Sequence, residues 1–220
     1  MNASSPTATF IGVTLALLGP TAIALGTKRL GSASLPLSLR ALGLLAFVML
    51  VAAVIAIALR VEKLSWHELG FGRVSWRSPL WAVALALFLI VVYGPLAAAA
   101  LARIGWGTFQ AGAASLAELP RWYLASVIIV VAAGEEWLYR GYAIERLESL
   151  TASTWIAGGL SALAFGAAHL PLWGPGPALI TLVSGGLLTA LYVWRRDVSF
   201  LILAHVATDL YGLLIAPPGM

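Results

Sequence analysis

Apolar stretches long enough to cross a bilayer recur along the whole 220-residue chain. A transmembrane helix needs about 20 apolar residues. Seven stretches come close to this length, at residues 9–26, 41–59, 80–101, 122–139, 154–170, 178–194 and 199–216. Pro20, which follows Gly19, predicts a kink in the first of them. The pattern predicts an all-α polytopic membrane helix bundle with about seven transmembrane helices, folded as a single membrane domain over residues 1–220.

The connections between the stretches are short and differ in character. Residues 28–40 are rich in Gly, Ser and Leu. Residues 62–78 mix charged with large apolar side chains, which predicts an amphipathic segment at the membrane interface. Residues 105–120 are expected to form a loop, and the proline-rich residues 171–177 a turn that is not helical throughout.

Composition excludes a soluble globular protein. Hydrophobic residues make up 61% of the chain and charged residues 10%, and the mean hydropathy is +0.95. Soluble domains carry about 25% charged residues. The chain has no cysteine, which excludes a disulfide framework and a thiolate site.

The formal net charge of +4 does not indicate nucleic-acid binding. The basic residues lie between the apolar stretches, where they face anionic headgroups and set topology. The connections after the second, fourth and sixth stretches hold eight Lys and Arg residues, and the opposite connections hold five. This excess favours a cytoplasmic N-terminus. No Lys or Arg precedes the first stretch, so we expect a retained membrane helix there rather than a signal peptide.

Two adjacent glutamates, Glu135 and Glu136, stand at the end of the apolar run 127–134, and Arg140 follows. A charge at membrane depth costs from roughly 2.5 kcal/mol upward. Residues four apart share a helix face, so Glu136 should meet Arg140 while Glu135 points elsewhere. A carboxylate without a cation could then act as a general base toward water. The alternative is a helix end with ordinary interfacial charges.

Two further apolar stretches carry histidines at the same one-turn spacing. Phe165 precedes His169 by four residues, and His205 precedes Asp209 by four. Asp209 could hydrogen-bond a ring nitrogen of His205 and fix its tautomer. The alternatives are a packing role for His169 and a helix–helix hydrogen bond for the second pair.

The order EExxxR, FxxxH and HxxxD resembles the three-motif signature of the CAAX protease and bacteriocin-processing family, also called the Abi family. The resemblance covers 122–214, which we take as the core that carries the motifs. The glycine pair after Ser184 and the segment that begins at His67 are also similar to the family. Such a resemblance implies an intramembrane endopeptidase.

The resemblance also implies a role for each motif. Glu135 and His169 would activate a water molecule, and His205 would bind the substrate carbonyl and its developing oxyanion. Glu136 and Arg140 would support the site.

Asp209 would bind the substrate carbonyl together with His205, but it stands where many members have Asn. An ionised carboxylate cannot donate a hydrogen bond to an oxyanion. If Asp209 is charged, its expected role is to orient His205 or a metal rather than to bind the oxyanion.

No cofactor is certain from the sequence, and zinc is one candidate. His169, His205 and Glu135 could hold Zn²⁺ with an open position for water. The chain lacks the compact HExxH pattern, and a metal-free mechanism uses the same residues. Both versions stay open at this point.

The expected partners are the lipid bilayer and a membrane-associated peptide or protein substrate, in a bacterial inner (plasma) membrane. A prenylated CAAX tail, a bacteriocin leader and a membrane-bound regulator are all compatible, and the oligomeric state is open. Two other functions compete: a non-catalytic scaffold or immunity protein, and a proton-coupled transporter. The absence of an inverted repeat argues against the transporter.

Overall fold

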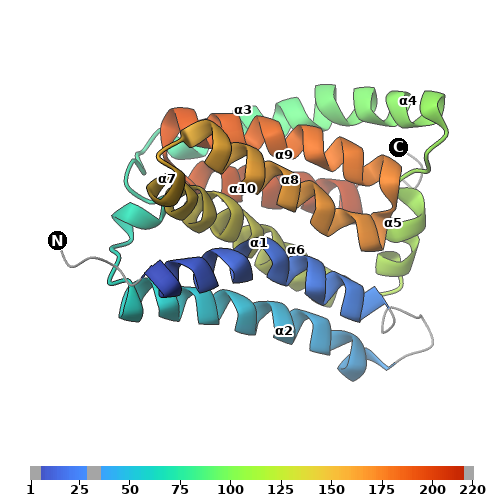
Figure 1. Ribbon diagram of the computed structural model, residues 1–220. Coiled ribbons are helices and arrows are strands. Elements are labelled where there is room, and N and C mark those ends of the chain that lie inside the picture. Colours follow the sequence, from blue (N-terminus) through green and yellow to red (C-terminus); the bar gives the residue numbers. More distant parts are fainter. Residues whose placement is uncertain (1–5, 29–35, 216–220) are drawn as a thin grey trace.

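A computed structural model describes residues 6–28 and 36–215, and all regular structure within these ranges is helical (Figure 1). The α-helices are α1 (Pro6–Lys28), α2 (Leu37–Ala56), α3 (Ser78–Phe88), α4 (Gly94–Ile104), α5 (Gln110–Ala117), α6 (Arg121–Glu136), α7 (Glu145–Thr151), α8 (Thr154–Trp173), α9 (Pro175–Arg195) and α10 (Ser199–Leu210). The π-helical segments are η1 (Ile57–Val61), η3 (Leu89–Tyr93), η4 (Trp137–Ile144) and η5 (Tyr211–Ile215), and η2 (His67–Leu69) is a 3-10 turn. Most of the predicted 28–40 connection, residues 29–35, lies outside the described ranges, as does residue 216.

The predicted fold class, an all-α polytopic bundle, is confirmed. In the described ranges, six continuous helices are long and apolar enough to cross a membrane: Pro6–Lys28, Leu37–Val61, Ser78–Ile104, Arg121–Thr151, Thr154–Trp173 and Pro175–Arg195. A shorter apolar helix, Ser199–Ile215, coincides with the seventh predicted stretch. The first helix runs on through Pro20.

Two boundaries predicted from the sequence are wrong. The fourth helix does not end near Tyr139 but continues as Arg121–Thr151, so the glutamate pair lies in mid-helix. Its polar side chains pair inside the bundle and therefore need not leave the membrane. The predicted loop 105–120 contains α5 (Gln110–Ala117), an alanine-rich segment with high helix propensity.

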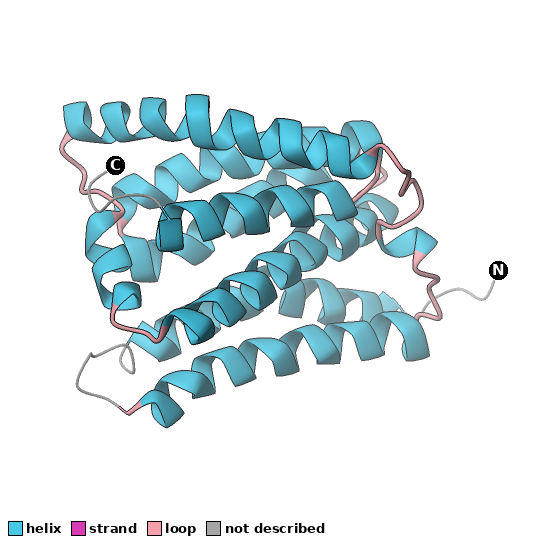
Figure 2. Cartoon of the chain, turned by 180° about the vertical axis from the view of Figure 1, so that it is seen from behind, coloured by secondary structure: helices cyan, strands magenta, loops and turns pink. Residues whose placement is uncertain are grey.

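The helix formed by α6 and η4 lies at the centre of the bundle. Figure 1 shows α1 and α2 on one side of it and α3 and α4 on the other, and Figure 2 shows the same order from behind. The element α10 packs against α3 and α6, and α8 packs against α1, α9 and η4. All eight residues of η4 are buried.

Helices α8 and α9 form a hairpin whose connection is a single residue. Helix α8 runs through Pro171 to Trp173 and α9 begins at Pro175, so only Gly174 interrupts the predicted turn. Its φ of 83° is a conformation that favours glycine. Along the hairpin, Gly166 faces Leu182 with no room for a Cβ atom, which lets the backbones approach closely.

The segment 62–78, predicted as interfacial, is partly inserted into one end of the bundle. Leu69 is fully buried, and the Gly70 carbonyl accepts a hydrogen bond of 2.8 Å from the backbone N–H of Val198. Trp66 and Trp76 remain exposed.

A buried carboxylate at the start of this segment, directly after η1, contacts α1 and η4. Glu62 accepts hydrogen bonds from the hydroxyl of Thr9 on α1, at 2.6 Å, and from that of Tyr142 on η4, at 2.7 Å. Only 5% of its surface is exposed. A buried carboxylate depends on such donors, since unmet acceptors are costly.

We expect Tyr142→Phe to lower the free energy of unfolding by about 1–3 kcal/mol, because the ring stays and one donor to Glu62 is lost. Helix content followed during SDS titration in mixed micelles measures this change. Tyr211→Phe is the matched control, since the Tyr211 hydroxyl makes no hydrogen bond within the described ranges. Equal transitions for the two variants would contradict a stabilising role for the Glu62 contact.

Candidate active site

The first motif lies where the central helix changes from α to π geometry. Glu136 is the last residue of α6, and Arg140 belongs to η4. Both side chains are fully buried, and Arg140 Nη1 donates to Glu136 Oε1 at 2.8 Å. The predicted pairing of these two residues is therefore present. Short π-helical segments occur frequently at functional sites.

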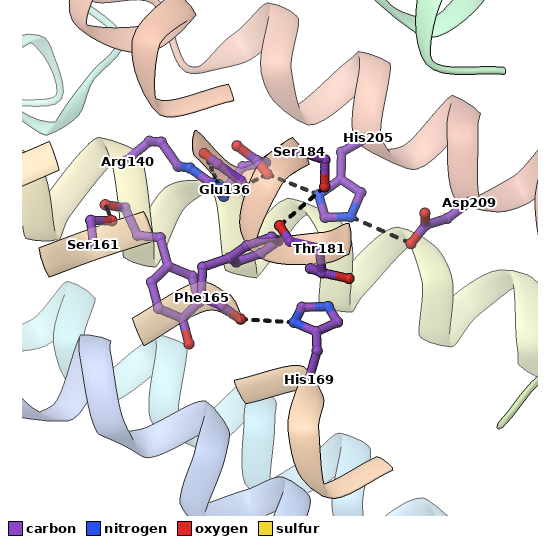
Figure 3. Close-up of polar contacts among 11 residues, drawn as sticks. Glu136, Arg140, Ser161, Phe165, His169, Thr181, Ser184, His205 and Asp209 are labelled. Carbon is purple, nitrogen blue, oxygen red and sulfur yellow. Dashed lines mark hydrogen bonds and ion pairs between the residues drawn. The ribbon is translucent and has the colours of Figure 1, made fainter. Parts of the chain in front are cut away.

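The same oxygen of Glu136 also holds a histidine from another helix. His205 Nδ1 on α10 lies 2.9 Å from Glu136 Oε1 (Figure 3). Glu136 Oε2 is buried and has no partner among the described residues. One carboxylate thus links the central helix with α10 and fixes the ring plane of His205.

Arg140 connects the central helix with α8 and α9. Its Nη2 donates to the Gly185 carbonyl of α9 at 3.1 Å, and its guanidinium carbon lies 4.2 Å from the centre of the Phe165 ring on α8. A Cβ atom on Gly185 would collide with the Phe165 ring. Glycine is therefore needed for this approach.

The Phe165 ring packs against several of the polar residues of the site. Its ring centre is 4.8 Å from that of His169 and 6.2 Å from that of His205, and Tyr139 contacts it edge-on at 5.2 Å. Figure 3 shows the two imidazoles on the same side of the site, with Phe165 beside them. The ring is 2% exposed, so it is a rigid spacer that positions both histidines.

His169 has a defined hydrogen-bonding pattern. Its Nδ1 lies 2.8 Å from the Phe165 carbonyl, which can only accept, so Nδ1 carries the proton. In the neutral ring Nε2 then keeps its lone pair. His169 is partly exposed near the end of α8.

His205 faces a second carboxylate on its other side. Its Nε2 lies 3.4 Å from Asp209 Oδ2, which is longer than an ordinary N–H···O hydrogen bond. The His205 side chain is 12% exposed and that of Asp209 40%. The outer side of the ring is therefore accessible from the Asp209 end.

Glu135 differs from its neighbour in having no close partner. Its side chain is partly exposed, and it makes no hydrogen bond or ion pair within the described ranges. Glu135 therefore takes no part in the Glu136–Arg140 pair, as the helical spacing predicted.

The donor atoms do not fit a three-residue zinc site in this arrangement. Within the described part of the chain, no three His, Cys, Asp or Glu side chains are grouped so that they could hold a metal ion. Both ring nitrogens of His205 are directed at carboxylates, and Nδ1 of His169 is directed at a backbone carbonyl.

Three contributors to the site were not identified from the sequence. These are the Glu136–His205 contact, the Gly185 carbonyl that binds Arg140, and Tyr139, whose buried hydroxyl has no partner among the described residues. The spacing within each motif reports contacts on one helix and carries no signal for contacts between helices. The third histidine, His67, is exposed in η2 and belongs to no part of this site.

Comparison with known proteins gives one result. Residues 116–211 match the family model described as Rce1-like, type II CAAX prenyl endopeptidase Rce1-like. No curated protein and no solved structure gives a match. The matched segment contains all three motifs and ends shortly after Asp209.

We expect Arg140→Ala to lower the free energy of unfolding by about 3–5 kcal/mol, because Glu136 stays buried without its cation. SDS titration in mixed micelles measures the loss. Arg103→Ala is the control, since Arg103 is exposed at the end of α4. The double variant Glu136→Gln/Arg140→Met removes both charges and should recover part of the loss. An unfolding transition identical to that of the parent would contradict the clamp.

Proposed function

Since residues 116–211 match the family model of the type II CAAX prenyl endopeptidases, we propose that this chain hydrolyses a peptide bond within the membrane, using a water molecule that Glu135 activates. The observation that carries the proposal is the convergence of three helices on one polar region. Glu135 comes from α6, His169 from α8 and His205 from α10; the Phe165 ring lies against both imidazoles, and His205 contacts Glu136, the neighbour of Glu135. Such a constellation in an apolar protein is costly unless it is used.

The proposed first step is the activation of water. Glu135 has no competing partner within the described ranges, and His169 Nε2 has a free lone pair in the neutral ring. A water molecule between them gives one proton to the Glu135 carboxylate, and its oxygen attacks the scissile carbonyl carbon. His169 accepts the second water hydrogen in a hydrogen bond and thereby orients the nucleophile.

The tetrahedral intermediate needs a donor for its oxyanion. We assign this role to the Nε2–H group of His205, because its contact with Asp209 is long and a substrate oxygen can replace it. In this proposal His205 is an imidazolium with both ring protons: Nδ1–H donates to Glu136, which holds the ring in place, and Nε2–H is left for the substrate. Glu135 then delivers its proton to the leaving amine nitrogen as the C–N bond breaks.

In this proposal Asp209 has a different role from the Asn that many family members carry at this position. As a carboxylate it cannot donate to the oxyanion. It holds the Nε2 side of His205 before substrate binds, and it is exposed enough to accept a backbone N–H of the substrate. The amide found at this position in many family members would contact the carbonyl oxygen directly.

The proposed chemistry uses side chains and water alone. Its support is that both His205 nitrogens are directed at carboxylates and that no three possible ligands are grouped within the described part of the chain. We further propose that the substrate is a membrane-associated peptide or protein and that the enzyme works in a bacterial inner membrane. The small size and the arginine- and alanine-rich composition support that location.

Glu135→Gln should reduce peptide cleavage by about 10²-fold or more, because the amide keeps the shape and loses the base. The assay uses purified protein in liposomes with a library of membrane-tethered fluorescent peptides, and mass spectrometry identifies the products. Glu118→Gln, a change at an exposed position, should leave cleavage unchanged. Cleavage at the parental rate by a folded Glu135→Gln protein would exclude Glu135 as the base. Absence of cleavage by the parent would favour the scaffold.

Removal of metal should leave cleavage intact. Protein dialysed against a chelator until elemental analysis finds metal well below one ion per chain is expected to keep its rate. Activity that disappears on dialysis and returns with zinc would contradict the metal-free proposal while preserving the protease.

A further inference from the structure

Two neighbouring hollows open at the end of the bundle where α9 ends and α3 begins. One, of about 360 Å³, is lined by Arg73, Trp194 and Arg195. The other, of about 330 Å³, is lined by Trp76, Arg77, Leu80, Trp81 and Ala84. The rings of Trp81 and Trp194 meet edge-on at 5.4 Å and so join the two hollows. We call these lining residues the arginine–tryptophan corner.

Arg195 is held in place by aromatic rings. Its guanidinium carbon lies 4.8 Å from the Trp81 ring centre, 5.5 Å from that of Trp194 and 5.6 Å from that of Phe200. Its Nε is buried and has no hydrogen-bond partner among the described residues. Stacking of this kind orients a guanidinium while its remaining N–H groups stay available.

The next residue along the chain, Arg196, differs from Arg195 because acidic side chains neutralise its charge. Arg196 forms ion pairs with Glu145 at 2.8 Å and with Glu148 at 2.7 Å. Arg195 has no such pair within the described ranges. These two acidic side chains therefore neutralise Arg196, and the charge of Arg195 remains available to an external anion.

The remaining nearby carboxylate is also occupied. Asp197 is fully buried, and it accepts hydrogen bonds from the hydroxyls of Ser78 and Ser199 and from the backbone N–H of Ser199. In the part of the chain that the structure describes, none of the three arginines of the corner, Arg73, Arg77 and Arg195, has an acidic partner. The corner therefore presents a positive charge that the protein does not compensate.

We propose that the arginine–tryptophan corner binds the phosphate of an anionic phospholipid, with an acyl chain along the exposed apolar face of α3. Guanidinium groups recognise phosphate through paired N–H donors. Tryptophan rings prefer the headgroup level of a bilayer, and Trp76 is 76% exposed. Leu80 lines the second hollow and is 62% exposed, which provides a surface for the chain.

The charge distribution along the sequence favours lipid over a soluble anion. The corner lies on the side that carries the excess of Lys and Arg, which the sequence predicts to be the cytoplasmic side, where anionic lipids attract basic segments. The apolar side chains next to the arginines would gain nothing from a free phosphate ion. A phospholipid satisfies both parts of the surface at once.

Native mass spectrometry of the detergent-released protein tests the proposal, with phosphatidylglycerol and phosphatidylcholine as probes. We expect the dissociation constant for phosphatidylglycerol to be several-fold lower than that for phosphatidylcholine. Arg195→Gln should raise it about fivefold, the weight of one arginine near an anionic surface. Because Arg195 packs against three rings, the exposed changes Arg73→Gln and Arg77→Gln provide independent variants.

Arg60→Gln is the matched control, since Arg60 is exposed at the end of η1 on the same side and lines neither hollow. Binding weakened equally by Arg60→Gln would show a diffuse basic surface and overturn the proposal. Equal affinity for the two lipids, or displacement of phosphatidylglycerol by millimolar inorganic phosphate, would overturn it as well. The proposal would also be overturned if all three corner variants kept the preference for phosphatidylglycerol over phosphatidylcholine.

Discussion

The site depends on a single buried carboxylate oxygen, Oε1 of Glu136, which accepts from Arg140 and from His205. Inside an apolar bundle neither the carboxylate nor the guanidinium is tolerated alone. Their pairing on one helix lowers that cost, and the third partner fixes α10 against the central helix. The helix register in this region therefore follows from an electrostatic requirement, and the positions of Phe165 and Gly185 follow from the need to enclose Arg140.

In the proposed mechanism, this arrangement gives the two adjacent glutamates different roles, one supporting the site and the other activating water. Glu136 is fully buried and engaged, whereas Glu135 is partly exposed and has no hydrogen-bond partner within the described ranges. Successive residues on a helix point about 100° apart, so one backbone segment presents one carboxylate to the core and the other to the accessible region. Phe165 contacts both imidazole rings, and the His169 residue remains partly exposed near the end of α8.

Much of the fold was predictable, because the length and hydrophobicity of a segment identify it as a membrane helix. The pairing of Glu136 with Arg140 was predictable as well, because it depends only on helical spacing. The Glu136–His205 contact was not, since it joins positions 69 residues apart and depends on how two helices slide and rotate against each other. The continuation of the fourth helix beyond Tyr139 was missed for a related reason: buried pairing makes charges tolerable that would otherwise mark a helix end.

The one-residue turn at Gly174 has a consequence for how the protein is made. With no loop to thread through the membrane, α8 and α9 can only be inserted together, as a helical hairpin that already contains Phe165, His169 and Gly185. The central helix precedes them and carries Glu136 and Arg140 as a self-neutralised unit. His205 lies on α10, which follows this hairpin along the chain, so the proposed site is complete only after the hairpin and α10 have both been inserted.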